Sequence, residues 1–144
     1  MKDRGRKPGY VSAIHAVVDR LFVYGTLRTG QTARSLIANH VVRWEPAATR
    51  GQMFAFPMGY PGIVEQGDLP VVGELVWLRD LAAAFALLDA YEGEDFKRTL
   101  KQVQRGDGTT EWAWCYVLAD PLTITLGDPI PDGDWVRYWE ASLG

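Results

Sequence analysis

The sequence predicts a mixed α+β domain whose sheet forms a small closed or partly closed barrel. Many short β-prone stretches are spread along the chain, and only two or three segments have helical character. At 144 residues, the chain is long enough for one domain with a substantial core. We therefore expect one folded unit over residues 21–144, preceded by a flexible N-terminal segment at residues 1–20.

The charge balance argues against nucleic-acid binding. The chain has 15 basic and 18 acidic residues, a formal net charge of −3, whereas a nucleic-acid surface needs a clustered basic excess. The one basic cluster, within residues 2–7, lies beside glycine and proline and is expected to be solvated. No stretch approaches the ~20 apolar residues of a membrane span, and no signal peptide is recognisable. The single cysteine, Cys115, excludes an internal disulfide, so we expect a cytoplasmic protein.

The first half of the chain is expected to hold most of the strands. Leu21–Tyr24 is a β-prone run that ends at a glycine, which predicts a buried strand followed by a loop. Thr32 is the predicted N-cap of a helix over Ala33–Asn39. Further strands are predicted at Val41–Trp44, Thr49–Phe56 and Val71–Leu78. Residues 57–62 are predicted to form a turn. Because Leu75–Leu78 is apolar at every position, its strand is expected to be buried on both faces.

The clearest helix is predicted over Leu81–Glu92. Asp80 is its candidate N-cap, and Gly93 suits a left-handed position just past its end. The helical spacing of four apolar residues predicts a stripe that faces the core: Leu81, Phe85, Leu88 and Tyr91. The chain then continues with a predicted hairpin, in which Arg98–Gln104 and Thr110–Leu118 flank a glycine-rich turn. Aromatic residues alternate with small ones in the second strand, so Cys115 is expected to be a buried structural thiol.

Glu92 is the strongest candidate for a functional acid. It is the last residue of a predicted helix, where the helix dipole disfavours a negative charge by only ~0.3–1 kcal/mol. Burial raises a carboxylate pKa much further, and Tyr91 and Phe96 offer apolar walls. The residues alone also fit a solvated acidic helix end, which is the commoner case.

The turn at Tyr24–Leu27 is the second candidate. Its successive backbone amides could form a nest for a carboxylate or an oxyanion, and Gly25 would let a ligand approach the main chain closely. An ordinary turn is the alternative interpretation of this segment.

Several motifs appear along the chain in one order. They are Tyr24-Gly25-Thr26-Leu27, Tyr60-Pro61-Gly62-Ile63-Val64, Gly73-Glu74-Leu75, Leu88-Asp89-Ala90-Tyr91-Glu92-Gly93, Ala113-Trp114-Cys115-Tyr116-Val117 and Gly133-Asp134-Trp135. Over about residues 21–136, the set resembles the γ-glutamylcyclotransferase-like family, including its AIG2-like and γ-glutamylamine cyclotransferase branches. The resemblance implies a compact mixed-strand β-barrel with flanking helices.

The resemblance also implies a reaction on a small γ-glutamyl compound. The α-amine attacks its own γ-carbonyl, which yields 5-oxoproline and a free amine. Glu92 occupies the position of the family's general acid/base. Tyr24, Gly25, Thr26 and Leu27 occupy the segment that binds the glutamyl part through backbone amides. Because ring closure is intramolecular, it needs no metal and no cofactor.

Two departures from the family's pattern leave alternatives open. Phe96 stands where many relatives have a tyrosine, and Gln31 is followed by Thr32-Ala33 instead of Asn-His. One alternative is a non-catalytic metabolite-binding or regulatory domain on the same fold. Another is a hydrolase or amidotransferase that uses the same acid and amides. Neither the released amine nor the oligomeric state follows from the sequence.

Overall fold

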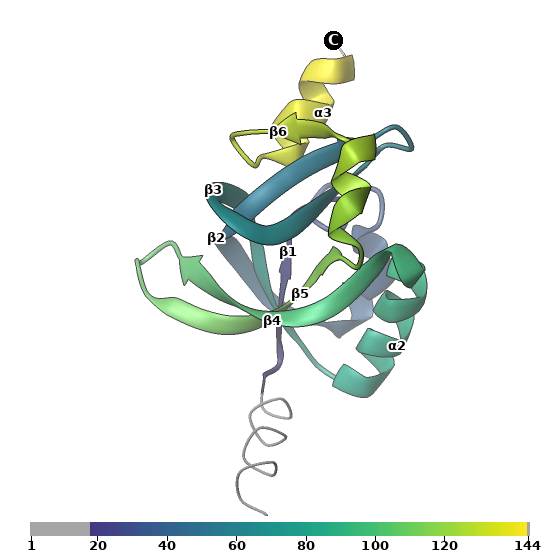
Figure 1. Ribbon diagram of the computed structural model, residues 1–144. Helices are drawn as coiled ribbons and strands as arrows, with labels where there is room; N and C mark the ends of the chain where they lie inside the picture. Colours follow the sequence, from purple (N-terminus) through teal and green to yellow (C-terminus); the bar gives the residue numbers. More distant parts are fainter. Residues whose placement is uncertain (1–17, 144) are drawn as a thin grey trace, which may run out of the picture.

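The computed structural model describes residues 18–143 (Figure 1). Most of the N-terminal segment that we expected to be flexible, residues 1–17, lies outside the described part of the chain. Val18 is already buried, with 2% of its surface exposed. Arg20 is the first residue of the first strand. The folded unit therefore includes the last residues of that segment.

Five strands close into a barrel of mixed strand directions. The described part of the chain has six strands, and the first five form the barrel: β1 (Arg20–Val23), β2 (Val41–Phe56), β3 (Tyr60–Leu78), β4 (Phe96–Arg105), β5 (Thr110–Leu118) and β6 (Asp128–Ile130). Their order is β3-β1-β5-β4-β2-β6, and the pairing of β2 with β3 closes the ring and leaves β6 outside it. Only β1 and β5 run parallel; the other pairs are antiparallel. This arrangement confirms the predicted mixed-strand barrel.

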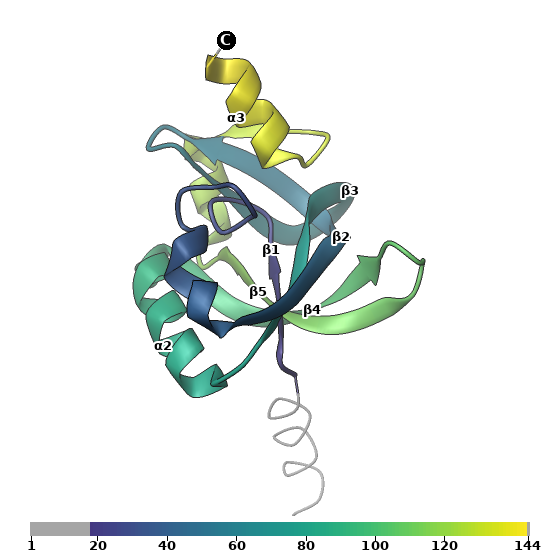
Figure 2. The same cartoon turned by 180° about the vertical axis from the view of Figure 1, so that it is seen from behind.

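Helical segments flank the barrel. They are the 3-10 helices η1 (Arg34–His40), η2 (Gly93–Asp95) and η3 (Pro121–Leu126), and the α-helices α2 (Leu81–Glu92) and α3 (Trp135–Leu143). Figures 1 and 2 show α2 and η1 on one flank of the barrel, and α3 at its far end beside β6. The described part of the chain contains no helix that is both long and apolar enough to cross a membrane.

The strands are buried on two faces, as the apolar run Leu75–Leu78 predicted. Leu75 belongs to the hydrophobic cluster inside the barrel. Every strand contributes residues to this cluster, and Trp135 of α3 is also part of it. Val76 and Leu78 belong to a second cluster, outside the barrel wall, with Phe85 and Leu88 of α2. Cys115 is fully buried in the first cluster, and burial raises the pKa of its thiol to about 12. It is therefore the structural thiol that we expected.

The strands predicted between residues 41 and 78 are longer in the structure. β2 continues through Pro46, although proline has no N–H to donate to a neighbouring strand. β2 pairs with β3 along its length but with β4 only at Ala47 and Ala48, so the β4 side requires no N–H from Pro46. The predicted turn at residues 57–62 is shorter than expected, since β3 already begins at Tyr60. Gly62 lies inside that strand, where an added Cβ would come within 2.7 Å of a methyl carbon of Leu118. Gly62 therefore permits close packing and does not form a turn.

Of the two predicted N-caps, Thr32 is wrong, whereas Asp80 does occupy the N-cap position of α2. The helix predicted over Ala33–Asn39 is the 3-10 helix η1, whose N-cap is Ala33 and not Thr32. Asp80 does precede α2, but it has left-handed backbone angles and its side chain caps no amide. Gly93 has the expected positive φ of 71°, although its ψ of −164° lies outside the left-handed helical region.

The bounds of α2 match the prediction, but its apolar stripe does not extend to Tyr91. Phe85 and Leu88 are buried, whereas Tyr91 is 47% exposed. At about 100° per residue, Tyr91 lies about 80° around the helix from Leu81, at the edge of the stripe. Its side chain instead faces the candidate site described below. The predicted hairpin is confirmed, with β4 and β5 paired antiparallel around residues 106–109.

Candidate active site

Four parts of the chain meet around a cavity of about 430 Å³. Residues 22–27 come from the end of β1 and the loop that follows it. Met58 comes from the turn between β2 and β3, and Tyr60 and Pro61 come from the start of β3. The end of α2 and the start of β4 supply Tyr91, Glu92, Asp95 and Phe96, and β5 supplies Tyr116. Both candidates from the sequence, Glu92 and the Tyr24–Leu27 turn, therefore line the same cavity.

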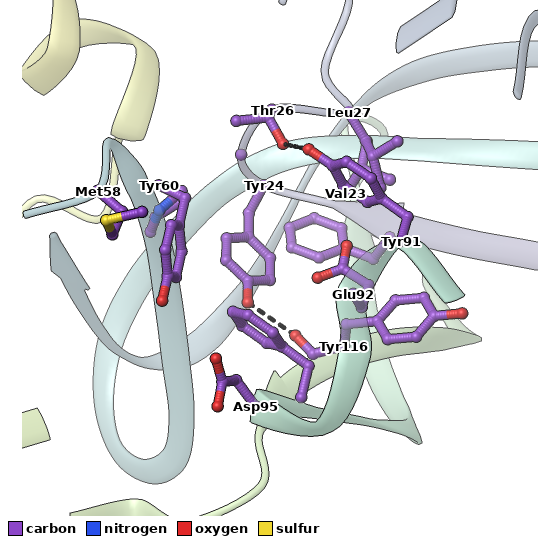
Figure 3. Close-up of a pocket in the computed structure, with 14 residues that line it drawn as sticks. Val23, Tyr24, Thr26, Leu27, Met58, Tyr60, Tyr91, Glu92, Asp95 and Tyr116 are labelled. Carbon is purple, nitrogen blue, oxygen red and sulfur yellow. Dashed lines mark hydrogen bonds between the residues drawn. The ribbon is translucent and has the colours of Figure 1, made fainter. Parts of the chain in front are cut away.

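Glu92 is largely surrounded by aromatic side chains. In Figure 3 its carboxylate lies among Tyr24, Tyr91 and Tyr116. No hydrogen bond or ion pair of this carboxylate is found within residues 18–143. Burial raises the pKa of Glu92 from 4.5 to about 7. A carboxylate with this pKa is poised to accept and return a proton near neutral pH.

The raised pKa comes from burial and not from the neighbouring acids. The nearby carboxylate of Asp89 is bound by Arg98, with Nε and Nη2 at 3.1 and 3.2 Å. The Tyr116 hydroxyl donates a third hydrogen bond to Asp89. The hydrogen bonds from Arg98 are the main reason that the pKa of Asp89 is lowered. Asp89 therefore stays charged and paired next to the cavity.

The Tyr24–Leu27 turn is held from two sides. The Tyr24 hydroxyl donates to the carbonyl oxygen of Tyr116 at 2.7 Å, and the Thr26 and Tyr91 hydroxyls lie 2.9 Å apart (Figure 3). In the described part of the chain, no protein acceptor is found for the amides of Gly25, Thr26 and Leu27. Main-chain donors without a protein partner at a cavity wall are suited to bind an anionic group.

Gly25 has a packing role that the sequence did not reveal. A Cβ at this position would lie 2.6 Å from Cγ of Pro61. The absence of a side chain therefore lets the turn pack directly against β3. The sequence suggested instead that Gly25 would give a ligand access to the main chain.

A buried carboxylate anchors the loop that follows this turn. Glu74 is 5% exposed and accepts hydrogen bonds from the Thr29 amide at 3.0 Å, the Thr29 hydroxyl at 3.0 Å and Arg34 Nη1 at 2.8 Å. Arg28 approaches the same carboxylate, with Nε at 3.8 Å. Glu74 lies opposite Val23 in the pairing of β1 with β3, at the end of β1. It therefore fixes the start of the loop relative to the barrel.

Several residues around the cavity were missed by the sequence reasoning. Tyr60, Asp95 and Tyr116 line it, and Arg98 lies behind it, with its guanidinium carbon 4.1 Å from the centre of the Phe85 ring. The alternation of β5 indicated that Tyr116 shares a face with Trp112 and Trp114, but not which face the site uses. Within residues 18–143, no group of three or more potential metal ligands lies together.

The fold and this cavity define the class of protein: a small mixed-strand barrel of the AIG2-like kind. The chain belongs to the γ-glutamyl cyclotransferase, AIG2-like family, whose model matches residues 21–137. This finding confirms the resemblance seen in the sequence and supports a γ-glutamylcyclotransferase-like function in general terms.

Individual relatives agree with this assignment. The chain is 33% identical over 120 residues to a γ-glutamylcyclotransferase family protein, ytfP, of Citrobacter rodentium, covering 81% of this chain and 95% of that protein. The crystal structure of YkqA from Bacillus subtilis superposes with a TM-score of 0.69 at 25% identity, covering 87% of this chain but only 42% of YkqA. An AIG2-like protein from Mus musculus superposes with a TM-score of 0.61 at 22% identity, covering 75% of this chain and 83% of that one. The last similarity concerns the fold alone.

Proposed function

We propose that this protein is a γ-glutamyl-amine cyclotransferase that releases 5-oxoproline and a free amine from a small γ-glutamyl compound. The observation that supports the proposal is that Glu92 and the residues Gly25, Thr26 and Leu27, whose amides have no protein acceptor within residues 18–143, line one cavity. The first offers proton transfer at neutral pH, and the second offers donors for the substrate's glutamyl part.

In this reaction the substrate's α-ammonium loses a proton to become nucleophilic. Its nitrogen attacks the γ-carbonyl carbon, and a ring carbon–nitrogen bond forms. Glu92 takes a proton from the attacking nitrogen and delivers a proton to the leaving nitrogen, after which the original carbon–nitrogen bond breaks. The released amine takes up a further proton from solution, so that the proton lost at the start is balanced. The amides of the Tyr24–Leu27 turn hold the glutamyl part, so that the two reacting groups stay close.

The test is product analysis with a simple substrate. The purified protein is incubated with the γ-glutamyl conjugate of butylamine, and 5-oxoproline, glutamate and butylamine are measured by mass spectrometry. We expect 5-oxoproline and butylamine, with kcat/KM rising as the pH passes through about 7, where Glu92 becomes deprotonated. Release of glutamate would instead identify a hydrolase, and binding without turnover would identify a metabolite-binding domain.

Glu92→Gln provides the matched variant, because it keeps the shape of the side chain and removes its proton transfer. We expect loss of 5-oxoproline formation with an unchanged circular dichroism spectrum. Glu94→Gln is the control, since Glu94 is exposed, lies two residues further along and does not line the cavity. Turnover by Glu92→Gln at the wild-type rate would contradict the proposal.

A further inference from the structure

Among the residues that the structure describes, no cationic side chain lines the cavity. Its 14 lining residues include no lysine, arginine or histidine, and its two ionisable acids are Glu92 and Asp95. Most of the remaining wall is aromatic or aliphatic. A ligand group that lies away from the Tyr24–Leu27 turn therefore meets acidic side chains and ring faces, and no cationic side chain that would neutralise a carboxylate.

Asp95 is an unpaired acid at this wall. It follows Glu92 by three residues, at the end of η2, and it is exposed. Within the described residues, no ion pair and no side-chain hydrogen bond of its carboxylate is found. Other acids near the site are engaged: Asp89 binds Arg98, Glu74 binds Arg34, and Asp134 binds Arg28. Asp95 thus stands out as a free negative charge.

Two aromatic rings accompany Asp95. Tyr60 and Phe96 both line the cavity, and their rings meet edge to face with centroids 6.0 Å apart. The pKa of the Tyr60 hydroxyl is raised by burial and, to a smaller extent, by the negative charge of Asp95. A carboxylate beside aromatic rings favours the binding of organic cations.

The proposed reaction sets the direction in which the substrate lies. Its glutamyl part is held at the Gly25–Leu27 amides, and its leaving nitrogen must reach Glu92. The group attached to that nitrogen then extends away from the amides. Figure 3 shows Thr26 on one side of the Glu92 carboxylate, with Asp95 on the opposite side and Tyr60 across the cavity. The amine's own substituent therefore points into the region of Asp95.

We propose that Asp95, together with the rings of Tyr60 and Phe96, forms a subsite for a positive charge on the leaving amine. The preferred substrates are then γ-glutamyl conjugates of diamines or of similarly cationic amines. Conjugates whose amine carries a carboxylate, as γ-glutamyl amino acids do, are disfavoured because two acids face them and no cation does. This inference rests on the proposed function and specifies its substrate class.

Three conjugates of equal chain length test this subsite. The γ-glutamyl group is joined to butylamine, to 1,4-diaminobutane or to 4-aminobutanoate, so that the far end is neutral, cationic or anionic. We expect kcat/KM to be about fivefold higher for the diamine conjugate than for the butylamine conjugate, as for a partly exposed charge pair. The 4-aminobutanoate conjugate should be the poorest of the three. The advantage of the diamine should shrink as salt is added.

Two variants test whether Asp95 causes the preference for the diamine conjugate. Asp95→Asn should reduce the ratio of diamine to butylamine turnover to about one. Glu94→Gln removes a negative charge from the neighbouring position, which does not line the cavity, and should leave the ratio unchanged. A ratio that survives in Asp95→Asn, or that Glu94→Gln abolishes equally, would overturn the assignment to Asp95.

Binding separates this inference from the proposed function. The same three conjugates are titrated calorimetrically into Glu92→Gln, which measures affinity without turnover. The order diamine, butylamine, 4-aminobutanoate supports the subsite even if no conjugate forms 5-oxoproline, in which case only the proposed reaction fails. Formation of 5-oxoproline with equal affinity for all three conjugates supports the reaction and overturns the subsite.

Discussion

The hydroxyl of Thr26 lies 2.9 Å from the hydroxyl of Tyr91, and this contact joins the two halves of the candidate site. Thr26 belongs to the Tyr24–Leu27 turn, which lines the cavity, and Tyr91 precedes Glu92 at the end of α2. The two residues are 65 positions apart in the chain. The contact therefore relates the position of the amides to that of the acid.

This contact predicts that Tyr91→Phe will weaken substrate binding more than it slows the chemical step. The variant removes one exposed hydrogen bond, of the kind that contributes about 0.5–1.5 kcal/mol, and leaves Glu92 in place. We expect KM for the butylamine conjugate to rise severalfold while kcat changes less, as steady-state kinetics would show. Tyr138→Phe, which removes a hydroxyl from α3, is the control. A fall in kcat with KM unchanged would mean that Tyr91 acts in the chemistry instead.

A second prediction concerns the dependence of stability on pH. The pKa of Glu92 in the folded protein, about 7, lies above the usual 4.5. The native state therefore holds this proton more tightly than the unfolded chain. The resulting stabilisation is fully present below pH 4.5 and is lost as the pH rises through about 7. At one pKa unit per ~1.4 kcal/mol, the whole effect is at most ~3 kcal/mol.

Glu92→Gln removes this dependence, because glutamine stays neutral at every pH. We expect the variant to be at least as stable as the wild type at pH 8, with the advantage shrinking as the pH falls toward 5. Urea denaturation at several pH values measures the difference in the free energy of unfolding. A variant that is clearly less stable at pH 8 would show that Glu92 serves as a structural anchor.

A third prediction concerns Glu74. Replacing this buried carboxylate by glutamine leaves the guanidinium group of Arg34 without its anion and leaves Arg28 paired with Asp134 alone. Breaking a buried ion pair costs about 3–5 kcal/mol. We expect a large fall in the midpoint of urea denaturation and a rise in KM, since the loop after the Tyr24–Leu27 turn loses its anchor.

The control for this variant is Glu45→Gln. Glu45 also binds an arginine, Arg105, at 2.9 Å, but the pair lies far from the cavity and is more exposed. We expect it to cost under about 1 kcal/mol and to leave KM unchanged. Equal losses of stability in the two variants would contradict the role given to burial.

The elements whose evidence is local in the chain were predictable from the sequence. Helix α2 depends on apolar residues spaced at helical intervals and ends where a glycine follows Glu92. The β4–β5 hairpin depends on a glycine-rich turn between two β-prone runs. Both had correct types and nearly correct bounds, because their hydrogen bonds join residues close in sequence. The ordered motifs also identified the family and placed Glu92 and Tyr24–Leu27 as its candidate residues.

The longer-range features could not be predicted from such patterns. Considered locally, Pro46 and Gly62 each predict the end of a strand, yet both lie within strands. The pairing of β2 with β3 and β4 accommodates Pro46, and the close approach of Leu118 accommodates only a residue without a side chain at position 62. Tyr91 follows the i, i+3 spacing from Leu88, but its offset of about 80° from Leu81 directs it toward the cavity. Such outcomes depend on the register between strands, which the chain's neighbouring residues do not specify.

The sequence by itself determined that the chain folds as a mixed barrel, that α2 ends at Glu92, and that a glycine turn follows β1. Only the tertiary structure decided that these two features share a cavity, that burial raises the pKa of Glu92 to about 7, and that Arg98 binds Asp89, whereas no side chain within residues 18–143 binds Asp95. The reason is physical: a helix end is set by nearby backbone hydrogen bonds, whereas desolvation and charge pairing depend on which distant side chains pack over a group.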